Sequence, residues 1–250
     1  EVYDQMSITG MVGVVFDPLL GLPLFLVVVI LSFLITLLTT LIYKWTTNQS
    51  LMKSLKDEIK SLQGLMKEAK SDPDEAMKLN QKLMAVNSKY FMQSMKPLFY
   101  TMLPILLIFG WMQASLAFDP LVVGEEFDVL AKLEESGEVN IDVPPQLTLT
   151  SAAKKEGEEV TFSMVPSKEG LYPVTLTSDK QSVQKEVRIT QERKYETPVS
   201  KYKGPFKTVT VVHQKAIAMN LFGWKLGWLG TYIIFSIVFS TALRKLLKVY

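Results

Sequence analysis

The sequence contains no cysteine and a single histidine, His213, which excludes several kinds of chemistry. Without cysteine the chain has no disulfides, no cysteine-ligated zinc site and no thiol nucleophile. His213 has no second histidine or cysteine to share a transition metal, and no Walker loop, G-x-S-x-G or H-E-x-x-H motif occurs. A formal net charge of only +2 argues against the strongly basic surface of a nucleic-acid-binding protein. We therefore expect no enzyme, no cofactor and no direct DNA binding.

Three uncharged apolar stretches dominate what is present, at Leu19–Tyr43, Leu98–Phe118 and Leu226–Leu243. Each is near or above the roughly 18–20 apolar residues that cross about 30 Å of hydrocarbon as a helix. The first stretch has no basic residues before it and is too long for the core of a signal peptide, so we expect it to be retained. The sequence thus predicts an α-helical membrane protein with three transmembrane helices.

The charges that flank these stretches predict their orientation. Residues 44–96 carry ten lysines against six acidic residues, and Arg244 and Lys245 follow the third stretch. Lys and Arg close to span ends favour the cytoplasmic side, although Lys225 before the third stretch argues mildly the other way. We expect a multi-pass protein of the plasma membrane with its N-terminus outside and its C-terminus in the cytoplasm.

The two regions between the spans differ in composition. Residues 44–96 are charged and helix-prone, whereas residues 119–221 are rich in Val, Thr and Ile and are interrupted by turn signals. We expect 119–221 to form a small β-rich sandwich of immunoglobulin-like type, with a short surface helix within Asp119–Gly137. The predicted strands are Val139–Val143, Leu147–Ser151, Val160–Val165, Leu171–Thr177, Val183–Thr190 and Phe206–Val212. The predicted organisation is an extracellular N-terminal segment (1–18), a transmembrane helix (19–43), a cytoplasmic hairpin (44–96), a second transmembrane helix (97–118), the extracellular β-rich domain (119–221), a third transmembrane helix (222–243) and a cytoplasmic tail (244–250).

Two amphipathic patterns predict an antiparallel coiled-coil hairpin within residues 44–96. Apolar residues recur in steps of three or four on either side of Asp72-Pro73-Asp74-Glu75, which is typical of a helix start. These carboxylates could weakly hold a divalent ion, but helix capping explains them better and we assign no metal site. The apolar positions are Leu51, Leu55, Ile59, Leu62 and Met66 before the turn, and Ala76, Leu79, Leu83, Val86 and Tyr90 after it.

The hairpin also holds half of the twelve methionines. They could fill gaps along the seam between the two helices. Alternatively, because methionine adapts to many apolar partners, they could form a surface for a hydrophobic client or the ribosome. The candidate client or ribosome contacts are Met52, Met66, Met77, Met84, Met92 and Met95.

Hydroxyl side chains recur at a spacing of four in the first and third spans. The simplest interpretation is helix packing, with each hydroxyl bonded to the preceding turn of its own helix. The sharper hypothesis is a hydrophilic groove open to the cytoplasm. Lys44 at its mouth is explained by snorkelling alone, but could also attract an acidic client segment. The candidate groove residues are Ser32, Thr36, Thr39, Thr40, Lys44, Thr101, Ser236, Ser240 and Thr241.

In the order of these features the chain resembles the archaeal YidC-like proteins of the Oxa/YidC membrane-insertase superfamily. The resemblance covers residues 19–118 and 222–250. Its motifs are Leu41-Ile42-Tyr43-Lys44 at the end of the first span, Asp72-Pro73-Asp74 at the hairpin tip, Asn87–Pro97 leading into the second span, and Gly227-Trp228-Leu229, Phe235-Ser236 and Leu243-Arg244-Lys245-Leu246-Leu247-Lys248 in and after the third.

The resemblance implies a three-span core with a groove exposed to cytoplasm and lipid, and a coiled coil that meets ribosomes or clients. Bacterial members have five core spans and a groove arginine, whereas this chain has three spans with no arginine inside them, so Lys44 is only a partial substitute. The outer β-domain is not part of the minimal pattern.

Our hypothesis is an insertase or chaperone for newly made membrane proteins. Its partners would be membrane lipids, nascent clients, the ribosome or translocon, and an unknown partner of the outer domain. The alternatives are a membrane-anchored surface binding protein or receptor that acts through the β-domain, and a structural subunit of a translocation complex.

Overall fold

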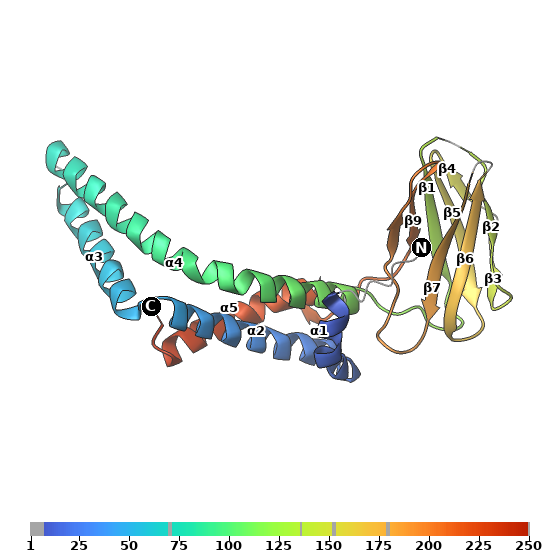
Figure 1. Cartoon of the computed structure of the whole chain (residues 1–250), viewed down its shortest axis with the longest axis horizontal. Helices are drawn as coiled ribbons and strands as arrows, with labels where there is room; N and C mark the ends of the chain where they lie inside the picture. Colours follow the sequence, from blue (N-terminus) through green and yellow to red (C-terminus); the bar gives the residue numbers. More distant parts are fainter. Residues whose placement is uncertain (1–7, 70–71, 136, 152–153, 179–180, 250) are drawn as a thin grey trace. The chain divides into compact units, whose positions relative to one another are not determined.

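The computed structural model describes residues 8–69, 72–135, 137–151, 154–178 and 181–249. The chain forms two compact units (Figure 1). The first is helical and comprises Glu1–Val15, Phe25–Gly110 and Leu229–Tyr250; the second contains the sheets and comprises Phe16–Leu24 and Trp111–Trp228.

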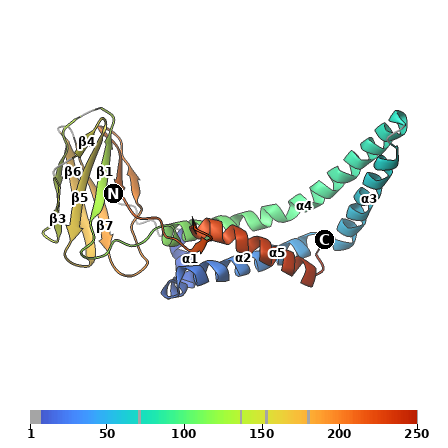
Figure 2. The same cartoon turned by 180° about the vertical axis from the view of Figure 1, so that it is seen from behind.

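Within these described residues, three helices are long and apolar enough to cross a membrane: α2 (Leu24–Thr46), α4 (Pro73–Leu116) and α5 (Trp228–Leu246). They run side by side in both views (Figures 1 and 2). Each predicted span falls on one of these helices with shifted ends. The first begins later than expected because residues Asp17–Gly21 form a 3₁₀ helix, η1, and Pro23, with its fixed φ and missing N–H, precedes α2.

The predicted N-terminal segment 1–18 contains one further helix, α1 (Ile8–Phe16). At about 1.5 Å per residue, its nine residues are too few to cross the hydrocarbon. Residues 1–7 lie outside the described part of the chain.

Residues 49–96 form two helices that share a hydrophobic seam. α3 (Gln49–Glu68) is capped by the Asn48 side chain, which accepts the Leu51 N–H, and α4 is capped by Asp72, whose Oδ1 accepts the N–H groups of Asp74 and Glu75, all at 3.1 Å. The seam is formed by the buried residues Leu55, Leu62 and Val86 with Ile59, Leu79, Leu83 and Tyr90 packed against them.

The second hairpin arm and the second span are one continuous helix, which we had expected to divide at Pro97. α4 runs for 44 residues with Pro97 and Pro104 inside it. Proline is tolerated within an apolar helix where neighbouring groups satisfy the freed backbone. Pro97 has no N–H to donate to the carbonyl of Gln93, four residues before it, and its own carbonyl accepts a hydrogen bond from Thr101 Oγ1 at 3.1 Å.

The second unit contains two antiparallel sheets. The larger has the order β3-β5-β1-β9-β8, with β4 also paired to β5, and the smaller has the order β2-β6-β7. The strands of the larger sheet are β1 (Phe127–Leu133), β3 (Leu147–Leu149), β4 (Lys154–Glu156), β5 (Glu159–Pro166), β8 (Val199–Lys201) and β9 (Phe206–Val211). Those of the smaller are β2 (Asn140–Asp142), β6 (Gly170–Ser178) and β7 (Gln181–Ile189); a separate pair is β10 (Met219–Leu221) with β11 (Trp224–Leu226).

The two sheets enclose one core and so form a sandwich. Side chains alternate between buried and partly exposed along β1 and β5, and β6 and β7 contribute Val174, Leu176 and Val187 to the same cluster. The strand order differs from that of an immunoglobulin constant domain, in which the first strand lies at a sheet edge. Here β1 lies between β5 and β9.

The prediction of a surface helix within Asp119–Gly137 is wrong. The segment contains β1, a central strand of the larger sheet. Phe127, Val129, Ala131 and Leu133 are all buried, which is the period of two that a strand requires.

An aromatic cluster joins the loops that follow α4, β7 and β9. The Tyr195 ring lies 5.6 Å from the Phe118 ring and 5.4 Å from His213, and its hydroxyl donates to the Gln113 carbonyl at 2.8 Å. His213 Nδ1 lies 3.1 Å from the Asp119 carbonyl oxygen, so this nitrogen carries the hydrogen. Burial is the main cause that lowers the pKa of His213, so the neutral ring is favoured.

Candidate functional site

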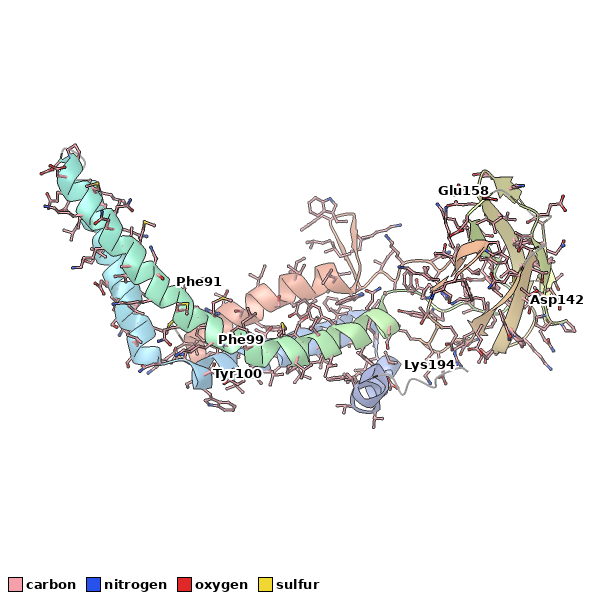
Figure 3. The ribbon with its side chains drawn as sticks, turned by 45° about the horizontal axis from the view of Figure 1, so that its top comes forward. Phe91, Phe99, Tyr100, Asp142, Glu158 and Lys194 are labelled. Carbon is pink, nitrogen blue, oxygen red and sulfur yellow. The ribbon has the colours of Figure 1, made fainter. Side chains whose placement is uncertain are left out.

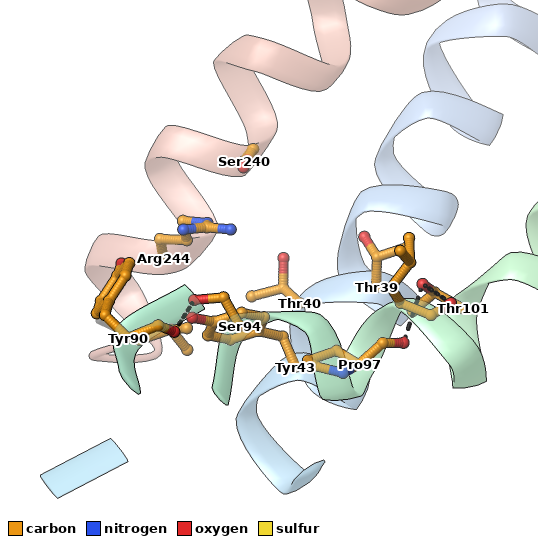
Figure 4. Close-up of a pocket in the computed structure, with 11 residues that line it drawn as sticks. Thr39, Thr40, Tyr43, Tyr90, Ser94, Pro97, Thr101, Ser240 and Arg244 are labelled. Carbon is orange, nitrogen blue, oxygen red and sulfur yellow. Dashed lines mark hydrogen bonds between the residues drawn. The ribbon is translucent and has the colours of Figure 1, made fainter. Parts of the chain in front are cut away.

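A polar cleft of about 380 Å³ lies among α2, α4 and α5 of the helical unit (Figure 4). All three candidate spans contribute to it. Its lining residues are Thr39, Thr40 and Tyr43 of α2, Tyr90, Ser94, Pro97, Leu98 and Thr101 of α4, and Ser240 and Arg244 of α5, with Val249 after that helix.

The cleft brings together four of the nine predicted groove residues, namely Thr39, Thr40, Thr101 and Ser240. The other five do not line it. Ser32 and Thr36 are buried in α2, Lys44 is half-buried near the end of that helix, and Ser236 and Thr241 lie elsewhere on α5.

The hydroxyl hydrogens of the three threonines in the cleft are satisfied within their own helices. Thr39 and Thr40 both donate to the Thr36 carbonyl, at 3.0 and 2.6 Å, and Thr101 donates to the Pro97 carbonyl. A hydroxyl oxygen that has donated its hydrogen still has lone pairs to accept with. These threonines can therefore accept hydrogen bonds from a molecule in the cleft, such as those of backbone N–H groups.

Sequence reasoning missed the residues that join the three helices. The Arg244 guanidinium of α5 lies 5.2 Å from the centre of the Tyr43 ring of α2, within cation–π range. Tyr43 also shares a side-chain hydrogen bond with Ser94 of α4, whose Oγ donates to the Tyr90 carbonyl at 2.9 Å. A signal was present, because Arg244 follows Ser240 by four residues and so shares its helix face, but we had used Arg244 for the orientation and the family resemblance and not for the groove.

Arg244 is the fixed positive charge of the cleft. Guanidinium remains protonated and presents five N–H donors in a planar fork that suits carboxylate and carbonyl oxygens. Among the described residues no carboxylate lies within ion-pair distance of it. The cleft thus combines one cation with several acceptor oxygens, a chemistry suited to a polar or acidic stretch of polypeptide.

The six candidate methionines divide by exposure. Met77, Met84 and Met92 of α4 are 57%, 66% and 65% exposed, and their spacings of seven and eight place them along one side of that helix. The side chains of Met66 and Met95 are half-buried. Met52 is fully buried, so it is not part of an exposed contact surface.

A basic hollow of about 460 Å³ lies along α3 of the same hairpin. Lys53, Lys56 and Lys60 line it together with Asp57, Ile59 and Gln63. Its charge suits an acidic partner.

The part of α4 beside the cleft presents a broad apolar surface. Phe91, Phe99 and Tyr100, labelled in Figure 3, are 60%, 72% and 64% exposed, and Leu103 and Leu106 are similarly exposed. Such a surface would be a liability in water but is ordinary for a helix that faces lipid.

A family model described as "Integral membrane protein EMC3/TMCO1-like" matches residues 13–152, more than half of the chain. The match includes α2, α3 and α4, and therefore two of the three helices that form the cleft. No curated protein matches the sequence. A solved structure, "Crystal structure of the S-layer protein rSbsC(31-844)", is similar at 17% identity and a TM-score of 0.26, over 35% of this chain and 13% of that protein. A similarity this weak and partial carries no argument about fold or function.

Proposed function

We propose that this chain is a non-enzymatic insertase for newly made membrane proteins. The chain belongs to the EMC3/TMCO1-like family of integral membrane proteins, which is related to the Oxa1/YidC/Alb3 insertase superfamily. The family relation supports a role connected with membrane-protein insertion. The observation that carries the finer proposal is the polar cleft among three candidate spans.

The cleft would act by shortening the apolar path that a polar segment must cross. A charged side chain at the centre of a bilayer costs several kcal/mol, with estimates that start at about 2.5–3.5. In the cleft, Arg244 would donate to carboxylate or carbonyl oxygens of the client while Thr40 and Thr101 would accept from its N–H groups. The part of the cost that comes from lost hydration would then be offset before the segment reaches hydrocarbon.

The orientation belongs to this proposal. Arg244, Lys245 and Lys44 gather where α2 ends and α5 ends, and positive charge favours the cytoplasmic side. The cleft would then open to the cytoplasm at the plasma membrane. The hairpin would project on the same side, with its exposed methionines meeting a hydrophobic client and its basic hollow meeting an acidic partner such as the ribosome.

The test is insertion of a client with a polar translocated segment into proteoliposomes that contain the full chain. The combined variant Thr39→Val, Thr40→Val, Thr101→Val and Ser240→Ala removes the hydroxyls of the cleft, and we expect slower insertion with unchanged folding. The matched control is Ser236→Ala with Thr241→Val, which removes hydroxyls of the same helix outside the cleft. Equal insertion by both variants would exclude the cleft as the route.

A second variant separates this function from that of a receptor acting through the sandwich. The Asp119 N–H donates to the Gln214 carbonyl at 2.9 Å, so the two ends of the sandwich insertion are adjacent. Residues 121–212 can therefore be replaced by a short Gly/Ser linker. An insertase acting through the cleft should retain its activity, whereas loss of activity would favour a function that resides in the sandwich.

A further inference from the structure

The short β10–β11 hairpin carries an unusual tip. Leu221 pairs with Trp224, which leaves Phe222 and Gly223 as a two-residue loop. Phe222 is 98% exposed, more than any other large hydrophobic residue among those described, and Trp224 is 74% exposed. Both side chains lie outside the sandwich core.

The backbone at this tip would favour a different residue. Phe222 and Gly223 have φ values of +50° and +92°, and positive φ at both positions is the mark of a type I′ turn. Such turns prefer Asn, Asp or Gly first, and a bulky residue with positive φ is uncommon. The Asn220 side chain supports the turn by accepting the Gly223 N–H at 3.0 Å. An exposed aromatic residue held at an unfavourable φ indicates a function outside the fold.

The chain attaches this hairpin to two candidate spans. β11 ends at Leu226 and α5 begins at Trp228, so only five residues lie between Phe222 and that helix, and this short connection holds the tip within about 20 Å of it. On the other side of the hairpin, the Ala216 N–H donates to the Ala117 carbonyl at 3.1 Å, directly after α4 ends. The chain therefore cannot carry the hairpin far from the ends of these two helices.

We propose that the β10–β11 hairpin is an interfacial membrane anchor, with Phe222 and Trp224 inserted at the boundary between lipid headgroups and acyl chains. Aromatic side chains gather at this depth, and burying one removes a large apolar area from water. Lys225 follows Trp224 and so points to the opposite face of the strand, where its ammonium group can reach lipid phosphates. This role explains a basic residue that is out of place under the charge rule. It does not depend on the proposed insertase function or on which leaflet is involved.

The absence of cysteine permits a direct test on the full chain in lipid nanodiscs. A spin label on Leu221→Cys reports from the hairpin, and a label on Leu149→Cys reports from the sandwich at matched exposure, since these residues are 37% and 40% exposed. Collisions with oxygen, which concentrates in lipid, are compared with those of a water-soluble nickel chelate. We expect the label at 221 to favour oxygen and the label at 149 to favour nickel.

Phe222→Asn separates membrane insertion from a purely structural role. Asparagine suits the first position of a type I′ turn, so this variant should keep or improve the stability of the hairpin. Combined with Trp224→Ser, it should shift the label at 221 toward nickel accessibility. A label at 221 that matches the one at 149 in the parent chain would overturn the proposal. Low accessibility to both reagents would also overturn it, in favour of a protein contact.

Discussion

The sandwich buries its large apolar side chains, whereas the helices of the other unit expose most of theirs. In the sandwich Phe206, Leu176 and Val209 are fully buried, and Lys185 is the one charged side chain among the described residues that is buried. In the apolar windows of α4 and α5 only 17% and 11% of residues are buried. The difference follows from the solvent, because water favours burial of apolar side chains in the sandwich whereas lipid hydrocarbon solvates them on the surface of the helices.

α2 lies between these extremes and shows where polarity enters the helical unit. Its window is 39% buried, the largest fraction among the three candidate spans, and it buries Ser32 and Thr36 together with Val28 and Leu31. A helix that packs on its neighbours can bury hydroxyls that bond to their own backbone. The polar cleft forms near the end of this packed helix rather than on the lipid-exposed faces.

We expect the largest effect on stability from a comparison of two phenylalanine-to-alanine variants, one in the sandwich core and one on the surface of α4. Phe206→Ala should destabilise the sandwich by about 3–5 kcal/mol because it empties a filled core. Phe99→Ala on α4 should cost much less, since its side chain is 72% exposed. Hydrogen exchange of the full chain in nanodiscs reports both, and Phe206→Ala should leave exchange in α2 unchanged. Comparable losses from the two variants would contradict a lipid-facing surface on α4.

The hairpin offers the next contrast, between its seam and its exposed stripe. Leu62→Ala removes a buried member of the seam and should destabilise the hairpin by about 2 kcal/mol or more. Met84→Ser changes a side chain that is 66% exposed and should alter stability by less than about 0.5 kcal/mol. Crosslinking from position 84 to a nascent chain should nevertheless weaken when Met77 and Met92 are both replaced by serine. If Met84→Ser instead loosens the hairpin, the methionines serve packing.

Arg244 tests whether the cleft acts through charge. Arg244→Ala should slow insertion of a client with an acidic translocated segment by about tenfold, equivalent to about 1.4 kcal/mol, because one charged donor is lost. Arg244→Lys should retain part of the rate, and a neutral client should respond less to either change. Rates from reconstituted vesicles give the comparison. An equal loss for acidic and neutral clients would assign Arg244 to packing on Tyr43.

The sequence predicted those elements in which a pattern of apolar residues continues without interruption over many residues. The three apolar helices and the seam positions follow from hydropathy and from spacing by three or four, and the cap at Asp72 follows from the residues around it. β1 was missed even though Phe127, Val129, Ala131 and Leu133 alternate. That alternation has the period of two that a strand requires, and it was the signal that could have identified β1.

The cleft was predictable in part, for a physical reason. Spacing places Ser240 and Arg244 on one face of a helix, but only tertiary packing decides that this face meets Tyr43 and Ser94. Conversely, Ser32 and Thr36 share the spacing of Thr40 yet are buried and do not line the cleft. The spacing of residues along one helix does not show at which residues the neighbouring helices move apart and open a cleft.

The smallest expected effect concerns the pH dependence of the sandwich. Burial lowers the folded-state pKa of His213 below the value of about 6.5 expected in the unfolded chain. Between the two values the unfolded state binds more protons, so the free energy of unfolding should fall as the pH is lowered through that window. His213→Gln keeps a donor for the Asp119 carbonyl but does not titrate, so this loss of stability should disappear. Denaturation of the full chain, followed by a fluorophore on Leu149→Cys at several pH values, measures the slope. The helical unit contains no histidine, so its stability should show no matching change with pH. If the slope of unfolding free energy against pH is unchanged in His213→Gln, the acid sensitivity comes from the carboxylates of the sandwich.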